Sequence, residues 1–350
     1  MEKQPLQYWN QQARNYDENI FSTIDEDSTG IILRIIEAYG SQDPSSVASR
    51  CVDLGCGVGK YLPQLAKHFR QVMAFDLSPK LVAIAQKEVK RKNLENVSVT
   101  VRDLAQVWYR SDPTGVGFGH LNEMESFGFA VMANVLIAPG DAGLHLLMLK
   151  NAHRSLCFGG RLLCIVPSLE SALYVTQRCE EERFEGPFCI GNESKPSRAE
   201  GADLLKGILR RSGVRTKHFL EPEFRFFASK GGFEVEECHR VSYHWRSEMG
   251  LASDTQVPQN LRESPLPWDW LFLLHKVPPR EPTIATHLVG VTKPGVAPVQ
   301  AVTKPLQRTA SAEGRLPLPT LLRATPAPEW ADSQKTALFS TKRASSVSPL

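Results

Sequence analysis

Residues 1–280 alternate short apolar runs with longer stretches in which apolar positions recur every three or four residues. Apolar runs of strand length occur at 51–54, 71–75, 97–101, 127–136 and 161–166. Helical spacing occupies intervals between them, at 60–69, 81–92 and 141–156. Such a strand–helix–strand alternation predicts right-handed crossovers and a parallel sheet of the α/β class.

Two local signals mark helix ends within this pattern. Ser78-Pro79 is typical of a helix start, with serine as N-cap and proline at the first helical position. Phe158-Gly159-Gly160 is typical of the turn that terminates a helix. Farther along, the pattern predicts a helix over 221–230 and strands over 233–241 and 270–277.

The stretches 168–220 and 242–268 between these later elements are less regular. Neither has the apolar content of a second complete core. We therefore predict one domain over 1–280, in which these two stretches cover the open end of the sheet and face the substrate.

The last 70 residues differ in composition from the rest. Residues 281–350 contain nine prolines, many Ala, Thr and Ser, and few aromatic residues. A chain of this kind buries too little apolar surface to offset its conformational entropy. We predict that 281–350 forms a disordered tail.

The formal net charge of +3 is unevenly distributed. Residues 281–350 carry eight Lys or Arg and four Asp or Glu, so the tail is +4 and residues 1–280 are −1. Nucleic-acid-binding folds usually show a strong basic patch. The near-neutral body therefore argues against a nucleic-acid partner.

No apolar run reaches the ~18 residues that a membrane-spanning helix needs, and the N-terminal sequence lacks the pattern of a signal or transit peptide. The seven cysteines include no CxxC pair and no Cys/His cluster of zinc spacing. We expect a cytoplasmic protein with reduced thiols, no bound metal and no membrane contact.

A glycine-rich loop, Asp53-Leu54-Gly55-Cys56-Gly57-Val58-Gly59, ends the first strand and precedes a helix. Its GxGxG spacing differs from the GxGxxG of dinucleotide-binding loops. It also differs from a Walker loop, which ends in Gly-Lys followed by Ser or Thr, because Tyr61 follows Gly59-Lys60. Glycine lets the backbone approach a ligand closely. The Asp53 carboxylate lies beside this loop. A carboxylate attracts an ammonium group and repels a pyrophosphate, so the loop suits a ligand that carries an ammonium group.

Three acids follow three successive strands. Besides Asp53, Asp76 ends the second strand and Asp103 follows the third. Open α/β sheets bind ligands at the carboxyl ends of their strands, where an acid can accept hydrogen bonds from a ribose diol. Asp76 is placed for that role, and Asp103 could accept from an adenine amino group.

These features together resemble the class I S-adenosylmethionine-dependent methyltransferases, over residues 8–277. Val52–Gly59 resembles the first motif of the family, Asp76 its ribose-binding acid, and Arg102-Asp103-Leu104 its adenine-side acid. Leu156–Leu163 resembles the family's LxPGGxL turn and fifth strand. The resemblance implies a Rossmann-like, mostly parallel seven-stranded sheet with helices on both faces and an antiparallel last strand.

The resemblance also implies S-adenosyl-L-methionine as the cofactor, with S-adenosyl-L-homocysteine as the product. Residues 1–25 resemble the family's N-terminal lid, in which a tyrosine helps to cover the cofactor. The residues implied to bind it are Tyr16, Asp53, Gly55, Cys56, Gly57, Gly59, Asp76, Leu77, Asp103, Leu104 and Asn134.

One position departs from the family. The fourth strand usually begins with an acid that helps to hold the cofactor or substrate, whereas this sequence has Gly128 there. Asn134 remains as a polar residue at the other end of the strand. The missing acid weakens the case for catalysis.

Methyl transfer from a sulfonium is an in-line displacement, so the protein mainly binds, orients and excludes water. A base is needed only when the acceptor must lose a proton, and histidine is the usual base. Four histidines lie in or near the covering segments, at positions 145, 153, 218 and 244, and the predicted candidate bases among them are His218 and His145.

Three functions remain open. The first is a methyltransferase acting on a small molecule, since no separate macromolecule-binding domain is visible. The second is a protein or peptide methyltransferase whose basic tail helps docking. The third is a catalytically inactive protein that binds the cofactor and serves as a regulatory or interaction subunit, as the glycine at position 128 favours. The glycine spacing argues against a dehydrogenase.

Overall fold

The computed structural model describes residues 5–16, 20–43, 45–106, 125–139, 142–182, 203–211 and 214–277. The predicted tail, 281–350, lies outside these residues. Within the described part of the chain, no helix is both long and apolar enough to cross a membrane.

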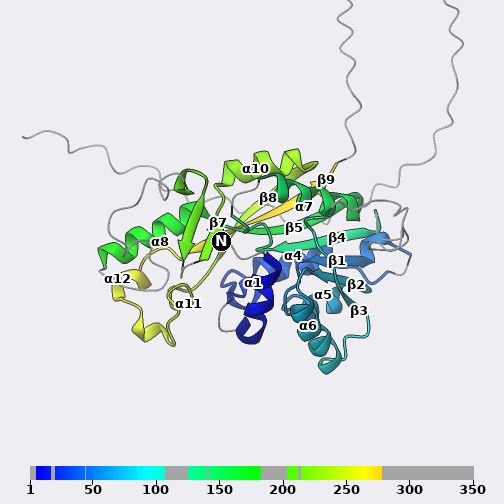
Figure 1. Cartoon of the computed structure of the whole chain (residues 1–350), viewed down its shortest axis with the longest axis horizontal. Coiled ribbons are helices and arrows are strands. Elements are labelled where there is room, and N and C mark those ends of the chain that lie inside the picture. The colour runs from blue at the N-terminus through cyan, green and yellow to red at the C-terminus, as the bar shows by residue number, and fades with distance from the viewer. Residues whose placement is uncertain are drawn as a thin grey trace, which may run out of the picture. The chain divides into compact units, whose positions relative to one another are not determined.

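The central feature is a seven-stranded sheet in the order β3-β2-β1-β4-β5-β9-β8 (Figure 1). Its first five strands are parallel, and β9 is antiparallel to both of its neighbours. This confirms the predicted mostly parallel sheet with an antiparallel last strand. The strands are β1 Arg50–Leu54, β2 Gln71–Asp76, β3 Val97–Val101, β4 Phe127–Ala133, β5 Leu156–Pro167, β8 Phe233–Ser242 and β9 Trp268–Lys276.

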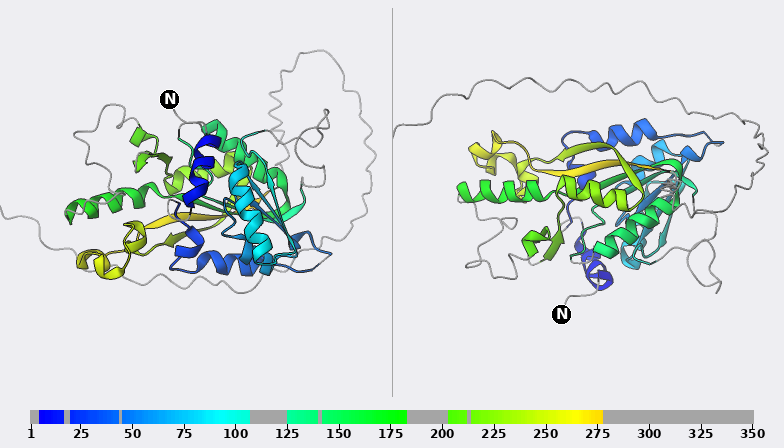
Figure 2. Two further views of the ribbon diagram at one scale, coloured as in Figure 1. Left: turned by 60° about the horizontal axis from the view of Figure 1, so that its bottom comes forward. Right: turned by 90° about the horizontal axis from the view of Figure 1, so that it is seen from above.

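Helices cover both faces of the sheet (Figure 2). One face packs against α4 (Ile31–Tyr39), α5 (Leu62–His68) and α6 (Pro79–Arg91). The opposite face packs against α7 (Ala142–Ser155) and α10 (Glu221–Lys230). The buried parallel strands are therefore apolar on both sides, as expected for an α/β sheet.

The helix start predicted at Ser78 is confirmed. The Ser78 hydroxyl accepts a hydrogen bond from the backbone N–H of Leu81 at 3.3 Å, and Pro79 is the first residue of α6. Such an N-cap satisfies one of the backbone donors that a helix start leaves without a partner. It also fixes α6 immediately after the strand end that carries Asp76.

Two predicted boundaries are wrong. Strand β5 begins at Leu156, directly after α7, so the glycines predicted as a terminating turn lie inside the strand. Gly159 has a φ of +77°, and the pairing of β4 with β5 shifts register between Phe127 and Phe129. The glycines therefore form an irregularity within the strand. Strand β4 ends at Ala133 and not at 136.

The covering segments contain structure that the sequence pattern left irregular. Residues 168–220 include α8 (Leu169–Glu181) and an antiparallel hairpin of β6 (Ile208–Arg211) and β7 (Val214–Lys217). Residues 242–268 include α11 (Trp245–Glu248), η4 (Asp254–Gln256) and α12 (Gln259–Arg262). A small apolar cluster joins the two segments through Val175, Cys179, Trp245, Met249, Val257 and Leu261.

The N-terminal part folds into short helices. These are α1 (Pro5–Gln12), η1 (Ala13–Asn15) and α3 (Thr23–Glu26), which precede α4. The 3-10 turn η2 (Val47–Ser49) then leads into β1.

Candidate cofactor site

The glycine loop between β1 and α5 adopts a backbone that favours glycine. Gly55, Gly57 and Gly59 have φ values of +82°, +55° and +89°, in the left-handed region that other residues rarely adopt. The backbone N–H groups of Gly55 and Cys56 both donate to the Phe75 carbonyl, at 2.7 and 2.9 Å. These two bonds tie the loop to the end of β2.

Space around the loop is also restricted. A Cβ atom on Gly55 would lie 2.5 Å from the Val135 side chain, and one on Gly57 would lie 2.5 Å from the Tyr16 hydroxyl. Tyr16 therefore lies over the loop, where the sequence predicts the cofactor lid.

Asp76 holds the loop from the neighbouring strand. Its Oδ2 accepts the Gly57 N–H at 2.9 Å, and its Oδ1 accepts the Ser78 N–H at 2.8 Å. Burial raises the pKa of this carboxyl, and the two backbone donors oppose that rise. Each carboxylate oxygen can accept a second hydrogen bond, so Asp76 retains capacity for a ribose diol. Leu77 lies partly buried between Asp76 and the cap of α6.

Asp53 lies near the end of the adjacent strand β1, but its hydrogen bonding differs from that of Asp76. Its side chain is 2% exposed, and its Oδ2 is buried without a hydrogen-bond partner among the described residues. Burial and the nearby Asp76 carboxylate raise the pKa of Asp53 to about 8. A buried acceptor that lacks a partner costs free energy, so it indicates a place where a ligand donor could bind.

Asn134 supplies a second oxygen of this kind. It follows β4, the strand that pairs with β1 in the register Asp53–Val131, and its Oδ1 is also buried without a partner in the described part of the chain. Asn134 has a φ of +52° and donates its backbone N–H to the Ile165 carbonyl at 2.9 Å. Two unpaired acceptors thus lie at neighbouring strand ends and fit a cationic or multiply donating group.

Asp103 and Leu104 follow β3 on the far side of β2. The Asp103 Oδ1 accepts the Ala105 N–H at 2.8 Å, and the Leu104 side chain is buried. The Asn151 amide of α7 donates to the carbonyls of Leu104 and Gln106, at 2.9 and 2.6 Å. The segment is therefore held in a defined turn beside the site.

Cys56 contributes its backbone to the loop. Its thiol is buried, and burial raises its pKa well above the usual value. The thiol is therefore protonated at neutral pH, which fits a small loop residue rather than a nucleophile.

The N-terminal helices rest on this loop and on α6. Asn10 Oδ1 accepts a hydrogen bond from the Ser78 hydroxyl at 2.7 Å, so the cap of α6 is also bonded to α1. Ala13 packs with Val58 and Leu81 in a small apolar cluster that includes Trp9, Tyr16 and Ile84. Asn10 lies in the N-terminal segment that resembles the family's lid, and this hydrogen bond places it at the border of the site.

The two histidines predicted as bases are both buried in packed surroundings. His218 follows β7, and its Nδ1 lies 3.0 Å from the Thr216 carbonyl oxygen. His145, in the first turn of α7, packs against Phe219 and Phe227, with ring centroids 6.0 and 6.4 Å apart. A catalytic role for either remains a prediction.

Gly128 lies near the beginning of the fourth strand, as the sequence pattern places it, but away from the predicted cofactor residues. It is at the amino end of β4, next to Phe129, which pairs with Cys51. A Cβ atom there would lie 2.5 Å from the Ala48 Cα atom of η2. The expectation that this position should carry an acid of the site is wrong, because it lies at the sheet edge opposite the glycine loop and its surroundings require glycine.

Two separate pairs of polar side chains link segments that are far apart along the chain. The Tyr61 and Thr23 hydroxyls are hydrogen-bonded at 2.6 Å. The Tyr243 hydroxyl donates to Asp269 at 3.0 Å. All but Asp269 are buried. The sequence pattern gave no signal for these pairs, because their partners are far apart along the chain.

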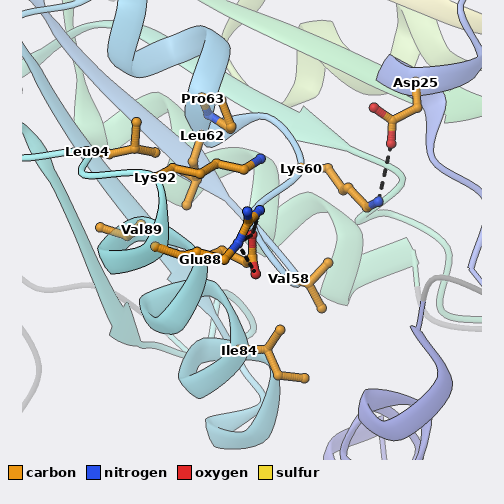
Figure 3. A pocket seen from close by; sticks show the side chains of 12 residues that line it. Asp25, Val58, Lys60, Leu62, Pro63, Ile84, Glu88, Val89, Lys92 and Leu94 are labelled. Atoms are coloured by element: carbon orange, nitrogen blue, oxygen red, sulfur yellow. Dashed lines mark hydrogen bonds and ion pairs between the residues drawn. The ribbon is translucent and has the colours of Figure 1, made fainter.

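A groove of about 360 Å³ lies between the glycine loop, α5 and α6 (Figure 3). Of the predicted cofactor residues, only Gly59 lines it. Its charged side chains include the pairs Lys60–Asp25, at 3.3 Å, and Arg91–Glu88, at 2.6 Å. The groove is therefore distinct from the cluster of acids. The described residues contain no group of three or more potential metal ligands.

Comparison with known proteins finds a family-model match over the central part of the chain. Residues 51–140 match the family model of a methyltransferase domain. That range includes every predicted cofactor residue except Tyr16.

Two curated relatives match over short segments. Ribosomal RNA small subunit methyltransferase A of Macrococcus caseolyticus is 36% identical over 76 residues, which is 22% of this chain and 24% of the relative. The tRNA/tmRNA (uracil-C(5))-methyltransferase of Pseudoalteromonas atlantica is 42% identical over 48 residues, which is 14% of this chain and 13% of the relative. The match thus spans a quarter or less of the length of these relatives.

Solved structures with a similar fold include a SAM-dependent methyltransferase from Methanosarcina mazei, at 17% identity and a TM-score of 0.46 over 69% of this chain and 97% of that one. Another, from Aquifex aeolicus, has 15% identity and a TM-score of 0.43 over 76% and 97%. With the strand order and the glycine loop described above, the chain has the fold of the class I S-adenosylmethionine-dependent methyltransferases, and its residues 51–140 match their methyltransferase domain.

Proposed function

We propose that this protein is an S-adenosylmethionine-dependent methyltransferase that binds its cofactor at the carboxyl ends of β1 to β4. The observation that carries the proposal is a pair of buried acceptor oxygens beside the glycine loop, on Asp53 and Asn134, for which the described residues supply no hydrogen-bond donor. Together they suit the ammonium group of the amino-acid part of the cofactor. The bound cofactor would supply an activated methyl group for in-line displacement.

The remaining predicted residues have roles in the same proposal. Asp76 accepts hydrogen bonds from the ribose, while Asp103 and Leu104 border the adenine. Gly55, Gly57 and Gly59 let the backbone approach, and Cys56 and Leu77 line the site through the loop and strand end. Tyr16 covers the cofactor.

The N-terminal segment 1–25 is proposed as the lid. Its described part connects the cofactor loop to the covering segment 242–268, because Phe21 packs edge-on against Tyr243 with ring centroids 4.6 Å apart. Just beyond it, the Ser28 hydroxyl donates to the Ser242 carbonyl at 2.7 Å, and Ser247 donates to Glu26 at 2.5 Å. These contacts support a role in orienting the two substrates and excluding water.

We further propose that the methyl acceptor is a small molecule. The segment 168–220 folds back on the carboxyl ends of the strands: Lys217 donates its backbone N–H to Ile137 at 3.0 Å, and Phe219 donates to Pro167 at 2.8 Å. Segments 168–220 and 242–268 also pack against each other through a separate small apolar cluster. If the acceptor must lose a proton, His218 and His145 are the candidate bases.

RNA is the competing acceptor, because the two curated relatives are named as RNA methyltransferases. A protein or peptide acceptor would instead draw on the basic segment 281–350 for docking. The hypothesis of a catalytically inactive cofactor-binding protein rested mainly on the missing acid at position 128. Gly128 lies away from the glycine loop, so this position no longer favours that hypothesis.

The test uses S-adenosylmethionine labelled in its methyl group, incubated with the full-length protein and a cell extract that is then separated into metabolite, RNA and protein fractions. We expect label in the metabolite fraction. Label confined to RNA or protein would contradict the small-molecule acceptor, and label in no fraction would contradict the enzyme. Asp76→Ala should abolish the signal, while Glu95→Gln, a change at an exposed acid, should preserve it.

A further inference from the structure

Asp53 is a buried carboxyl group whose described surroundings offer no compensating positive charge. The described residues give it no ion pair, and its Oδ2 has no hydrogen-bond donor among them. The ionisable groups that face it are Cys51 on its own strand, Cys56 in the glycine loop, Asp76 at the end of β2 and Tyr61 before α5. Each of these is neutral or negative at neutral pH.

The neighbouring Asp76 shows what is missing at Asp53. Two backbone N–H groups point at the Asp76 carboxylate and stabilise its charge. At Asp53 the same charge would be buried next to a second carboxylate. Burial and that neighbour raise the pKa of Asp53 to about 8, so the neutral acid is favoured at physiological pH.

We propose that Asp53 is a neutral acid in the cofactor-free protein and releases its proton to solvent when the ammonium group of the cofactor arrives beside it. The proposal rests on the cofactor site proposed above. Before binding, the proton is on Asp53 and the cofactor amine is a cation. Afterwards an Asp53 carboxylate is paired with that cation, and one proton is in the buffer.

This exchange makes cofactor affinity depend on pH. Where one proton is released per binding event, the apparent affinity falls up to tenfold for each pH unit below about 8. Above pH 8 the cofactor amine itself begins to lose its charge, because α-amino groups titrate near ~8. The affinity should therefore be highest near pH 8.

Calorimetry with S-adenosylhomocysteine tests the proposal on the full-length protein. Titrations at pH 6.5 in phosphate and in Tris, which differ in ionisation enthalpy, measure the number of protons released. We expect close to one for the wild type and for Glu95→Gln, a change at an exposed acid outside the site. We expect none for Asp53→Asn. 5′-Methylthioadenosine, which lacks the amino-acid part, should release none from the wild type.

The outcomes separate this inference from the proposed function. Binding without proton release, or release that persists in Asp53→Asn, would overturn the inference and leave the cofactor site standing. Release with S-adenosylmethionine but not with S-adenosylhomocysteine would place the charge partner at the sulfonium and overturn the assignment to the amine. Failure of every one of these ligands to bind would overturn the proposed function.

A second measurement applies if Asp53→Asn no longer binds. The melting temperature of the free wild-type protein should fall between pH 5.5 and 8 more steeply than that of Asp53→Asn. Equal pH dependence in the two proteins would show that Asp53 carries no proton in this range and would overturn the inference.

Discussion

At the scale of single residues, the environment of each acid matters more than its type. Asp53 and Asp76 lie at the ends of adjacent strands and are 2% and 8% exposed. Asp76 accepts two backbone N–H groups, whereas one oxygen of Asp53 accepts none from the described residues. The Asp76 carboxylate therefore holds the glycine loop, whereas the Asp53 side chain is placed to bind a charged ligand.

Replacing Asp53 by Asn should stabilise the free protein at high pH. Between pH ~4 and ~8 the folded state holds a proton on Asp53 that the unfolded chain has lost, because the folded pKa is about 8. The free energy of unfolding of the wild type should thus fall as pH rises, by up to about 1.4 kcal/mol per pH unit. Chemical denaturation at pH 5.5 and 8 measures this slope. Equal slopes in Asp53→Asn and the wild type would contradict it.

Gly57→Ala should weaken cofactor binding at least tenfold, because its Cβ would displace the Tyr16 hydroxyl. Gly159→Ala is the matched control, since Gly159 also has a positive φ but has no described atom within 4 Å of the added Cβ. Both variants should lose about 1–2 kcal/mol of stability through backbone strain. Calorimetric affinity that falls equally in both would contradict a specific role for the contact with Tyr16.

At the scale of elements, α1 depends on a few contacts with the cofactor loop and α6. Its main described anchors are the hydrogen bond from Ser78 to Asn10 and the packing of Trp9 against the small apolar cluster around Leu81. A short helix of eight residues has little stability of its own. Its position should therefore respond to small changes at these anchors.

Asn10→Ala should increase hydrogen exchange in residues 5–16 and weaken cofactor binding several-fold. The free energy of global unfolding should change by less than about 1 kcal/mol, because only one hydrogen bond is lost. Hydrogen-exchange mass spectrometry and calorimetry measure the two effects. A loss of global stability without faster exchange in α1 would contradict this account of the lid.

Elements with a strong local signal were predictable from sequence. The buried strands and the Ser78 cap follow from apolar runs and cap chemistry. Helix α4 is not among the predicted elements, although its sequence carries helical periodicity in the buried residues Ile31, Ile32, Ile35 and Ile36. The predicted start of β5 differs from the observed one because a Gly-Gly pair is typical of both a helix end and a strand irregularity.

The candidate site was predictable only in part. The acids and glycines follow strand ends, which the sequence pattern places at one edge of the sheet. Three features depend on three-dimensional packing. They are the Oδ2 of Asp53, which has no donor among the residues that the structure describes, the bond between Asn10 and Ser78, and the location of Gly128 against Ala48. No local pattern encodes contacts of this kind.

At the scale of the whole molecule, the charge of +3 describes two unlike parts. Residues 281–350 are +4, and residues 1–280, which hold every proposed site residue, are −1. The net charge therefore says little about what the cofactor domain binds.

Deletion of 281–350 should leave methyl transfer to a small acceptor within about twofold of the wild type, since no proposed site residue lies in that segment. Rates measured with the labelled metabolite fraction test this. A large loss of activity on deletion would favour a macromolecular acceptor that docks on the basic tail.

The central claim is that S-adenosylmethionine binds at the carboxyl ends of β1 to β4. Calorimetric titration of the full-length protein with this cofactor, compared with the Asp76→Ala variant, tests it most directly. We predict binding of one cofactor per chain and a loss of affinity of tenfold or more in the variant, which lacks the ribose acceptor and the anchor of Gly57. Equal affinity in the two proteins, or no binding to the wild type, would contradict the account.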